Sequence, residues 1–163
     1  RKIMSHNNVE EIDHKGKTLV KDKGELKELA DKIIEEQLLD DVKEAEVGFV
    51  LVYPYISKNT AGRCIKASAE MKLYSGYDYV VEMSGDLWDK LDDEKHYILM
   101  FHELMHIMPT YNDKKGEWNF GLVDHDVQDF RKIINKYGVD WIDELRTLAE
   151  SVHEVESMER LSL

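Results

Sequence analysis

The chain has little cysteine and no long hydrophobic run. Its 163 residues include one cysteine, Cys64, which excludes an intramolecular disulfide and argues against an oxidising compartment. The apolar segments at 47–56 and 97–108 are shorter than the about 20 residues that a membrane-spanning helix needs. The first residues, RKIMSHNNVEE, contain no apolar signal-peptide core. We therefore expect a cytoplasmic protein with no membrane partner.

Positive charge is the minority charge of this chain. The 22 lysines and arginines are outnumbered by 34 aspartates and glutamates, which gives a net charge of -12. Because this excess repels phosphate backbones, we expect no nucleic-acid partner. The apolar share of 42% and the charged share of 34% are typical of a globular protein, and the length suits one domain. We expect that domain over residues 24–163, after an N-terminal extension, residues 1–23, that is either a hairpin around Gly16 or disordered.

The strand patterns predict a small sheet of about three strands. Residues 47–56, VGFVLVYPYI, are β-branched and aromatic, which is typical of a buried strand that ends near Pro54. Residues 63–75 and 77–84 are interpreted as two adjacent strands joined by a tight turn at Ser75 and Gly76. Together with the helices described next, these strands predict an α+β fold.

Helical patterns occur before, between and after these strands. Residues 24–38 carry apolar side chains at spacings of three and four, which predicts a helix packed on the sheet. A short helical turn is predicted near Trp88, followed by a longer helix from about 93 to 108 that Pro109 ends. By composition, residues 110–122 are a loop. Two C-terminal helices are predicted at about 124–137 and 141–158.

The segment YILMFHELMHIMP places two histidines four residues apart in an almost wholly apolar stretch. On a helix this spacing is about one turn, so the imidazoles of His102 and His106 leave the same face and can bind one ion. Glu103 lies about 100° around the helix from His102, which suits a general base that reaches a metal-bound water. The H-E-x-x-H pattern therefore predicts His102 and His106 as Zn²⁺ ligands and Glu103 as the catalytic residue.

A metal-free core with two buried histidines is the alternative interpretation of this pattern. Polar side chains in so apolar a helix carry a desolvation cost unless a partner compensates for it. A metal ion would be such a partner, which favours the metal site. The lone Cys64 lies in a predicted strand, and we expect it to be a small buried hydrophobic residue rather than a nucleophile.

A catalytic zinc site needs a third protein ligand and keeps a fourth position for water. The downstream candidates are carboxylates and imidazoles, namely Glu117, Asp124, His125, Asp126, His153 and Glu154. We favour His125, because DHDVQDF is expected to open a helix that holds its first side chains rigidly and directs them at the earlier helix. Asp126 or Asp129 could then orient the imidazole. His153 lies among glutamates on a helix face that we expect to be solvated.

The runs SGYDYVVEMSGDLWDKLDDE, HELMHIMP and VDHDVQDF follow one another in an order that resembles the family of putative phage metallopeptidases. The resemblance covers about residues 24–138. It implies a zincin-like fold, with the N-terminal helix and the H-E-x-x-H helix packed on the small sheet. It also implies that His102, His106 and His125 bind zinc and that Glu103 is the catalytic carboxylate. A phage-encoded member would act in the host cytoplasm.

A zinc-dependent peptidase is the function that these residues predict. Bound Zn²⁺ lowers the pKa of its water towards 7, and Glu103 takes the proton as the water attacks a peptide carbonyl. The expected partner is a protein or peptide substrate. The alternative is a catalytically silent zinc-binding interaction protein of phage or prokaryotic origin, whose acidic surface would suit a basic protein partner.

Overall fold

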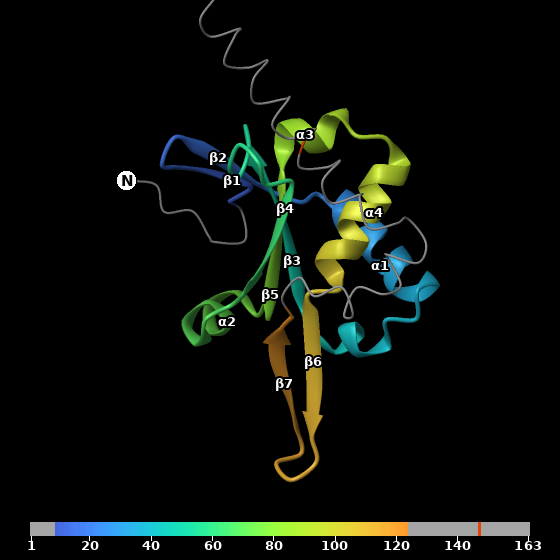
Figure 1. The fold of residues 1–163 in the computed structure, drawn as a ribbon. Coiled ribbons are helices and arrows are strands. Elements are labelled where there is room, and N and C mark those ends of the chain that lie inside the picture. The colour runs from blue at the N-terminus through green and yellow to red at the C-terminus, as the bar shows by residue number, and fades with distance from the viewer. Residues whose placement is uncertain (1–8, 124–146, 148–163) are drawn as a thin grey trace, which may run out of the picture.

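The main layer of the protein is a mixed five-stranded sheet (Figure 1), seen in a computed structural model that describes residues 9–123 and Thr147. The strands are β1 (Glu11–His14), β2 (Lys17–Lys21), β3 (Val47–Tyr53), β4 (Gly62–Lys66) and β5 (Tyr79–Ser84). Their order in the sheet is β1-β2-β3-β5-β4. Strands β3 and β5 run parallel, and the other neighbours are antiparallel. The α+β class is as predicted, but the sheet is larger than the three strands expected.

The two additional strands form a hairpin around Gly16. Lys15 and Gly16 have φ angles of 52° and 78°, the pair of positive values that a type I′ hairpin turn requires. Strand β2 continues the main sheet by pairing with β3, where Leu19 lies opposite Val52. The residues of β2 are half-buried on both faces except at Lys21, so this strand lacks the alternation that would have marked it as part of the sheet.

Two helices cover one face of the sheet (Figure 1). They are α1 (Glu25–Glu36), which follows the predicted apolar stripe, and α4 (Asp93–Leu104), which carries the H-E motif. The short α3 (Gly85–Lys90) and the 3₁₀ helix η2 (Asp40–Glu44) connect neighbouring elements. The core between these helices and the sheet contains Leu26, Ile33, Phe49, Val81, Met83, Leu99, Phe101 and Leu104. No helix among the described residues is long and apolar enough to cross a membrane.

The predicted strand over 63–75 is wrong in its second half. Strand β4 ends at Lys66, and helix α2 (Ala69–Ser75) follows before β5. The helix begins because the hydroxyl of Ser68 accepts a hydrogen bond from the backbone N–H of Met71 at 3.2 Å, and it ends at Gly76 with a φ of 78°. Strands β4 and β5 are antiparallel neighbours in the sheet, as predicted. The chain connects them through helix α2 and not through a tight turn.

The predicted helix over 93–108 is too long, and the predicted loop after it is a hairpin. Helix α4 ends at Leu104, and the chain turns into β6 (Ile107–Asn112), which pairs with β7 (Glu117–Leu122). Pro109 lies inside β6, where a two-stranded ribbon tolerates a residue without an N–H because each strand has an open edge. This ribbon, the β6–β7 hairpin, projects from the body (Figure 1). The predicted helices at 124–137 and 141–158 lie outside the described residues.

Candidate metal centre

The candidate site lies at the C-terminal end of α4. His102 and Glu103 belong to its last turn and are 4% and 3% exposed, whereas His106 follows the helix and is half-buried. The helix begins at Asp92, whose carboxylate accepts a hydrogen bond from the N–H of Lys95 at 2.9 Å. Its buried face packs in the core. Core packing therefore holds the backbone that carries the motif.

The imidazoles of His102 and His106 converge on one point. Their Nε2 atoms are 3.3 Å apart, and the two rings meet edge to face. Two nitrogens that each lie about 2.0–2.1 Å from a tetrahedral zinc ion are about 3.3–3.4 Å apart. The spacing of the two nitrogens therefore fits one shared cation.

The contact between His106 and Val123 determines which ring nitrogen carries the proton. Nδ1 of His106 lies within hydrogen-bond distance of the carbonyl oxygen of Val123. Because a carbonyl only accepts, Nδ1 must donate, and Nε2 keeps its lone pair on the side that faces His102. A backbone carbonyl on the far nitrogen is the usual support of a metal-bound histidine. The N–H of Val123 also donates to the carbonyl of His106 at 2.8 Å, so two hydrogen bonds join the same pair.

Glu103 is a buried carboxyl beside these nitrogens. Its Oε1 lies 3.8 Å from Nε2 of His102, and its Oε2 has no hydrogen-bond partner among the described residues. Burial alone raises the pKa of Glu103 from 4.5 to about 8. A buried carboxyl oxygen without a hydrogen-bond partner destabilises the folded state. Groups of this kind are typical of functional sites. With the two imidazoles, Glu103 forms a cluster whose candidate ligand atoms lie within 4.8 Å of one another and whose chemistry suits a divalent cation.

An open cleft leads to this cluster. Its walls are formed by the start of β4 and the end of the hairpin, with the lining residues Gly62, Arg63, Cys64, Glu103, His106, Leu122 and Val123. A Cβ atom on Gly62 would lie 3.0 Å from Sδ of Met83 and 3.3 Å from Cγ of Glu103. The absence of a side chain at Gly62 therefore allows the edge strand to approach Glu103 closely.

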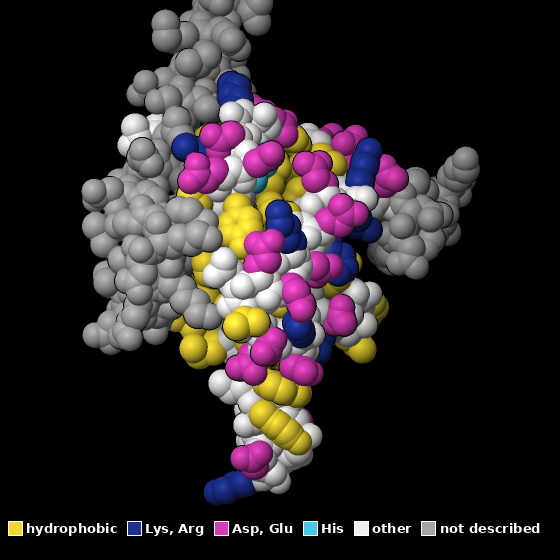
Figure 2. Space-filling model, turned by 90° about the vertical axis from the view of Figure 1, so that its right-hand side faces the viewer, with side chains coloured by type: hydrophobic (Ala, Val, Ile, Leu, Met, Phe, Trp, Pro, Cys, Tyr) yellow, Lys and Arg dark blue, Asp and Glu magenta, His cyan; other side chains and the backbone are white. Residues whose placement is uncertain are grey.

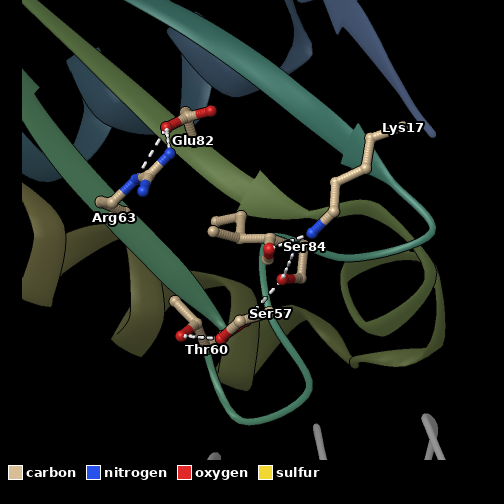
Figure 3. A network of polar contacts seen from close by, with 7 residues as sticks. Lys17, Ser57, Thr60, Arg63, Glu82 and Ser84 are labelled. Atoms are coloured by element: carbon tan, nitrogen blue, oxygen red, sulfur yellow. Dashed lines mark hydrogen bonds and ion pairs between the residues drawn. The ribbon is translucent and has the colours of Figure 1, made fainter. Parts of the chain in front are cut away.

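A network of polar contacts fixes the start of β4 (Figure 3). Arg63 donates from Nε at 2.9 Å and from its terminal nitrogen at 2.6 Å to the same oxygen of Glu82. Because Glu82 alternates along β5 with two core residues, this ion pair lies on the face of the sheet opposite α4. The hydroxyl of Ser84 donates to the carbonyl of Thr60 and accepts from the N–H of Ile56. The loop before Gly62 is thereby tied to the end of β5.

A third histidine of the α4 region, and two residues considered from the sequence, lie in different positions. His96 stacks on Trp88 with ring centroids 3.9 Å apart, so it belongs to the packing of α3 on α4. Glu117 begins β7 opposite Asn112, at the end of the hairpin away from His106, and the structure does not bring it to the cluster. Cys64 is partly buried, and burial followed by the charge of Glu103 raises the pKa of its thiol to about 12.

The remaining candidate ligands Asp124, His125, Asp126, His153 and Glu154 lie outside the described residues, as does Asp129. Sequence reasoning missed two groups at this site, namely Gly62 and the carbonyl of Val123. A backbone carbonyl has no residue-type signal. The glycine follows the turn signals SKNTA, but nothing in that pattern points to Glu103.

The comparison with known families bears on this arrangement. Residues 17–153 match the family described as Putative phage metallopeptidase. The chain belongs to this family. No curated protein and no solved structure matches the chain. The name of the phage metallopeptidase family indicates a metal-dependent hydrolase that acts on proteins or peptides and is associated with phages. The match includes the H-E-x-x-H cluster and the strands β2 to β5 of the sheet.

Proposed function

We propose that the protein is a zinc-dependent peptidase of zincin-like architecture, which acts in the host cytoplasm when it is phage-encoded. His102, His106 and His125 would hold Zn²⁺, and Glu103 would be the general base. The observation that carries this proposal is the 3.3 Å separation of the two Nε2 atoms, with the lone pair of His106 directed by its bond to Val123.

The choice of zinc rests on the donor atoms. Imidazole nitrogens in a tetrahedral arrangement suit zinc, and catalytic zinc sites commonly have three protein ligands. We take His125 as the third ligand because it follows Val123 by two residues in the sequence, and an extended chain spans about 7 Å over that distance. Val123 itself contacts His106.

Bound zinc would supply a Lewis acid that polarises a peptide carbonyl and makes a nearby water acidic. Glu103 lies close enough to His102 to accept a proton from a water in the same site, with Oε1 at 3.8 Å from Nε2. After Glu103 has taken this proton, it can donate it to the departing amine. The burial of α4 on the core keeps this carboxyl in place with little reorganisation.

The edge of β4 beside Glu103 suits a substrate that binds in an extended conformation. Among the described residues β4 has one neighbour in the sheet, β5, and its first residues line the cleft beside Glu103. An edge strand has backbone N–H and C=O groups that can pair with an added strand. We infer that a peptide binds alongside β4, which Gly62 allows to approach the catalytic carboxyl closely.

Zinc analysis and Glu103→Gln together test this proposal. Protein prepared without chelator should contain close to one zinc per chain, and His102→Ala should lose it. Glu103→Gln should keep the zinc and the circular dichroism spectrum, but hydrolysis of a quenched fluorescent peptide library should fall by about 10²-fold or more. Glu28→Gln, at an exposed position of α1, is the matched control and should cleave normally.

Equal hydrolysis by Glu103→Gln and the unsubstituted protein would contradict the assignment of the general base. Stoichiometric zinc with no hydrolysis of any library member would favour the catalytically silent zinc-binding protein instead. A zinc content near zero after reconstitution would contradict both functions.

A further inference from the structure

A second hollow lies on the other side of the His106 turn. It is a groove between η2 and β6, lined by Leu38, Leu39, Asp40, Asp41, Val42, Leu104, Met105, Ile107, Met108, Pro109 and Val123. Its floor is formed by buried core residues, among them Val42, Leu104 and Ile107. We call this hollow the η2 groove. Nine of its lining residues are apolar, and the two aspartates lie together in the first turn of η2.

The rim of the η2 groove exposes large apolar side chains. Leu38 is 74% exposed, and Met108 on the facing strand is 48% exposed. Leu38 also has a φ of 56°, a left-handed conformation that is uncommon for a branched side chain and costs free energy. This backbone conformation ends α1, because the N–H groups of Leu38 and Leu39 donate to the carbonyls of Glu35 at 3.4 Å and Ile34 at 2.9 Å. The exposed side chain of Leu38 adds nothing to core packing, so the apolar rim that it forms is a candidate binding surface.

The η2 groove adjoins the candidate metal centre through residues in their walls. Met105 and Ile107, the two neighbours of His106, line it, and so does Val123, which also lines the cleft beside Glu103. A ligand in the groove would therefore contact residues on both sides of a proposed zinc ligand.

Charge indicates what kind of chain would enter. Asp40 lies 3.5 Å from Lys43, and Asp41 has no ion-pair partner among the described residues. Figure 2, which views the side of α1 and α4, shows acidic side chains next to hydrophobic ones where the hairpin leaves the body. An apolar floor with an acidic rim complements an apolar side chain that has a lysine or arginine beside it.

We propose that the η2 groove is a substrate-anchoring site that takes one or two apolar side chains flanked by basic residues in an extended peptide. Its volume of about 250 Å³ is below the range of about 300–1,000 Å³ for sites that enclose a whole small ligand, so it suits side chains of a longer chain. This inference rests on the proposed peptidase function, because it assigns the substrate of the same site.

Binding of three labelled peptides tests the groove without any cleavage step. The peptides are GSKLLKSG, the charge-reversed GSELLESG and the polar GSKSSKSG, each with a fluorescein. Anisotropy titrations use the full chain as Glu103→Gln with zinc present, so that bound peptide stays intact. We expect GSKLLKSG to bind at least about tenfold more tightly than either of the others.

Two groove variants and one matched control complete the experiment. Leu38→Asn removes the apolar rim, and asparagine tolerates a left-handed φ, so affinity for GSKLLKSG should fall about tenfold while thermal stability stays equal or rises. The double change Asp40→Asn with Asp41→Asn should reduce the preference for GSKLLKSG over GSELLESG. Glu25→Gln with Glu28→Gln, exposed acids in the first turn of α1, should change neither value.

Equal affinity for the three peptides, no binding of any of them, or unchanged affinity in both groove variants would overturn the η2 groove proposal. None of these results bears on zinc content or on the effect of Glu103→Gln on hydrolysis. Conversely, a protein that binds GSKLLKSG selectively through Leu38 but hydrolyses nothing would refute the peptidase and leave the groove as a peptide-binding site.

Discussion

Among single residues, the burial of Glu103 should have a measurable effect on how the free energy of unfolding depends on pH. Burial raises its pKa from 4.5 to about 8 in the folded protein without metal, whereas in the unfolded chain the value returns to about 4.5. Between these two pH values the folded protein keeps a proton that the unfolded chain has lost. The free energy of unfolding therefore falls as the pH rises from about 4.5 to 8, and this contribution is fully present only below pH 4.5.

We predict that metal-free Glu103→Gln has a flatter stability profile than the unsubstituted protein. Urea unfolding of chelator-treated samples at pH 5 and pH 8 should show a loss of up to a few kcal/mol with the glutamate and a smaller loss with the glutamine. Glu28→Gln should behave like the unsubstituted protein, because its side chain is exposed in α1. Parallel profiles for all three proteins would show that Glu103 is not desolvated.

The thiol of Cys64 gives a second prediction for one residue. Its pKa is raised from 9 to about 12 by burial and by the charge of Glu103, so the reactive thiolate is depleted at pH 8. Alkylation by iodoacetamide at pH 8, followed by mass spectrometry, should be slower by about three orders of magnitude in the folded protein than in urea. Similar rates in both conditions would mean that the thiol is accessible and ionised.

Among the elements, the β6–β7 hairpin positions His106. The hydroxyl of Tyr79 in β5 donates to the carbonyl of Gly121 at 2.7 Å, and the Tyr79 and Phe120 rings meet edge to face with centroids 6.1 Å apart. Lys72 of α2 lies over the same Phe120 ring at 4.6 Å. These contacts fix the base of the hairpin, and through Val123 they fix the ring of His106.

Tyr79→Phe should loosen this support without creating a cavity. Tyr79 is fully buried, and the substitution removes the hydrogen bond to Gly121 while keeping the ring, so we expect a loss of about 1 kcal/mol in the free energy of unfolding. Metal affinity, measured by competition with a chromogenic chelator, should fall as well. Tyr53→Phe, which removes a hydroxyl contact with Asp89 remote from the hairpin, serves as control and should leave metal affinity unchanged.

The elements that the sequence predicts well are those with one simple pattern. Helix α1 follows from its apolar stripe, and the H-E-x-x-H spacing brings His102 and His106 together as expected. The predicted end of α4 is wrong because apolar residues continue from Leu104 into β6, so hydrophobicity does not mark the change from helix to strand. Helix α2 buries none of its residues, so only its Ser68 cap distinguishes it from a strand.

For the whole molecule, the dominant property is the charge of -12 on 163 residues. Like charges repel one another more in the compact state than in the unfolded chain, and salt screens this repulsion. The screening length falls from about 30 Å at 10 mM salt to about 8 Å at 150 mM. The folded state should therefore gain stability when salt is added.

We predict that Tm rises by about 2–4 °C between 10 and 150 mM sodium chloride at pH 7.5, which corresponds to about 1 kcal/mol. Differential scanning calorimetry measures this shift, and an equal osmolality of sucrose separates screening from solvent exclusion. A Tm that falls with salt would show that attractive ion pairs outweigh the net repulsion.

The double hydrogen bond between His106 and Val123 also has a consequence for engineering. Both ends of the β6–β7 hairpin are fastened to each other at the point where the ribbon leaves the body. Lengthening or shortening the ribbon beyond these two hydrogen bonds should therefore leave the position of His106 unchanged. The turn at residues 113–116, at the far end, is therefore a place where a fluorophore, an epitope or a longer insertion should leave the candidate metal centre unchanged.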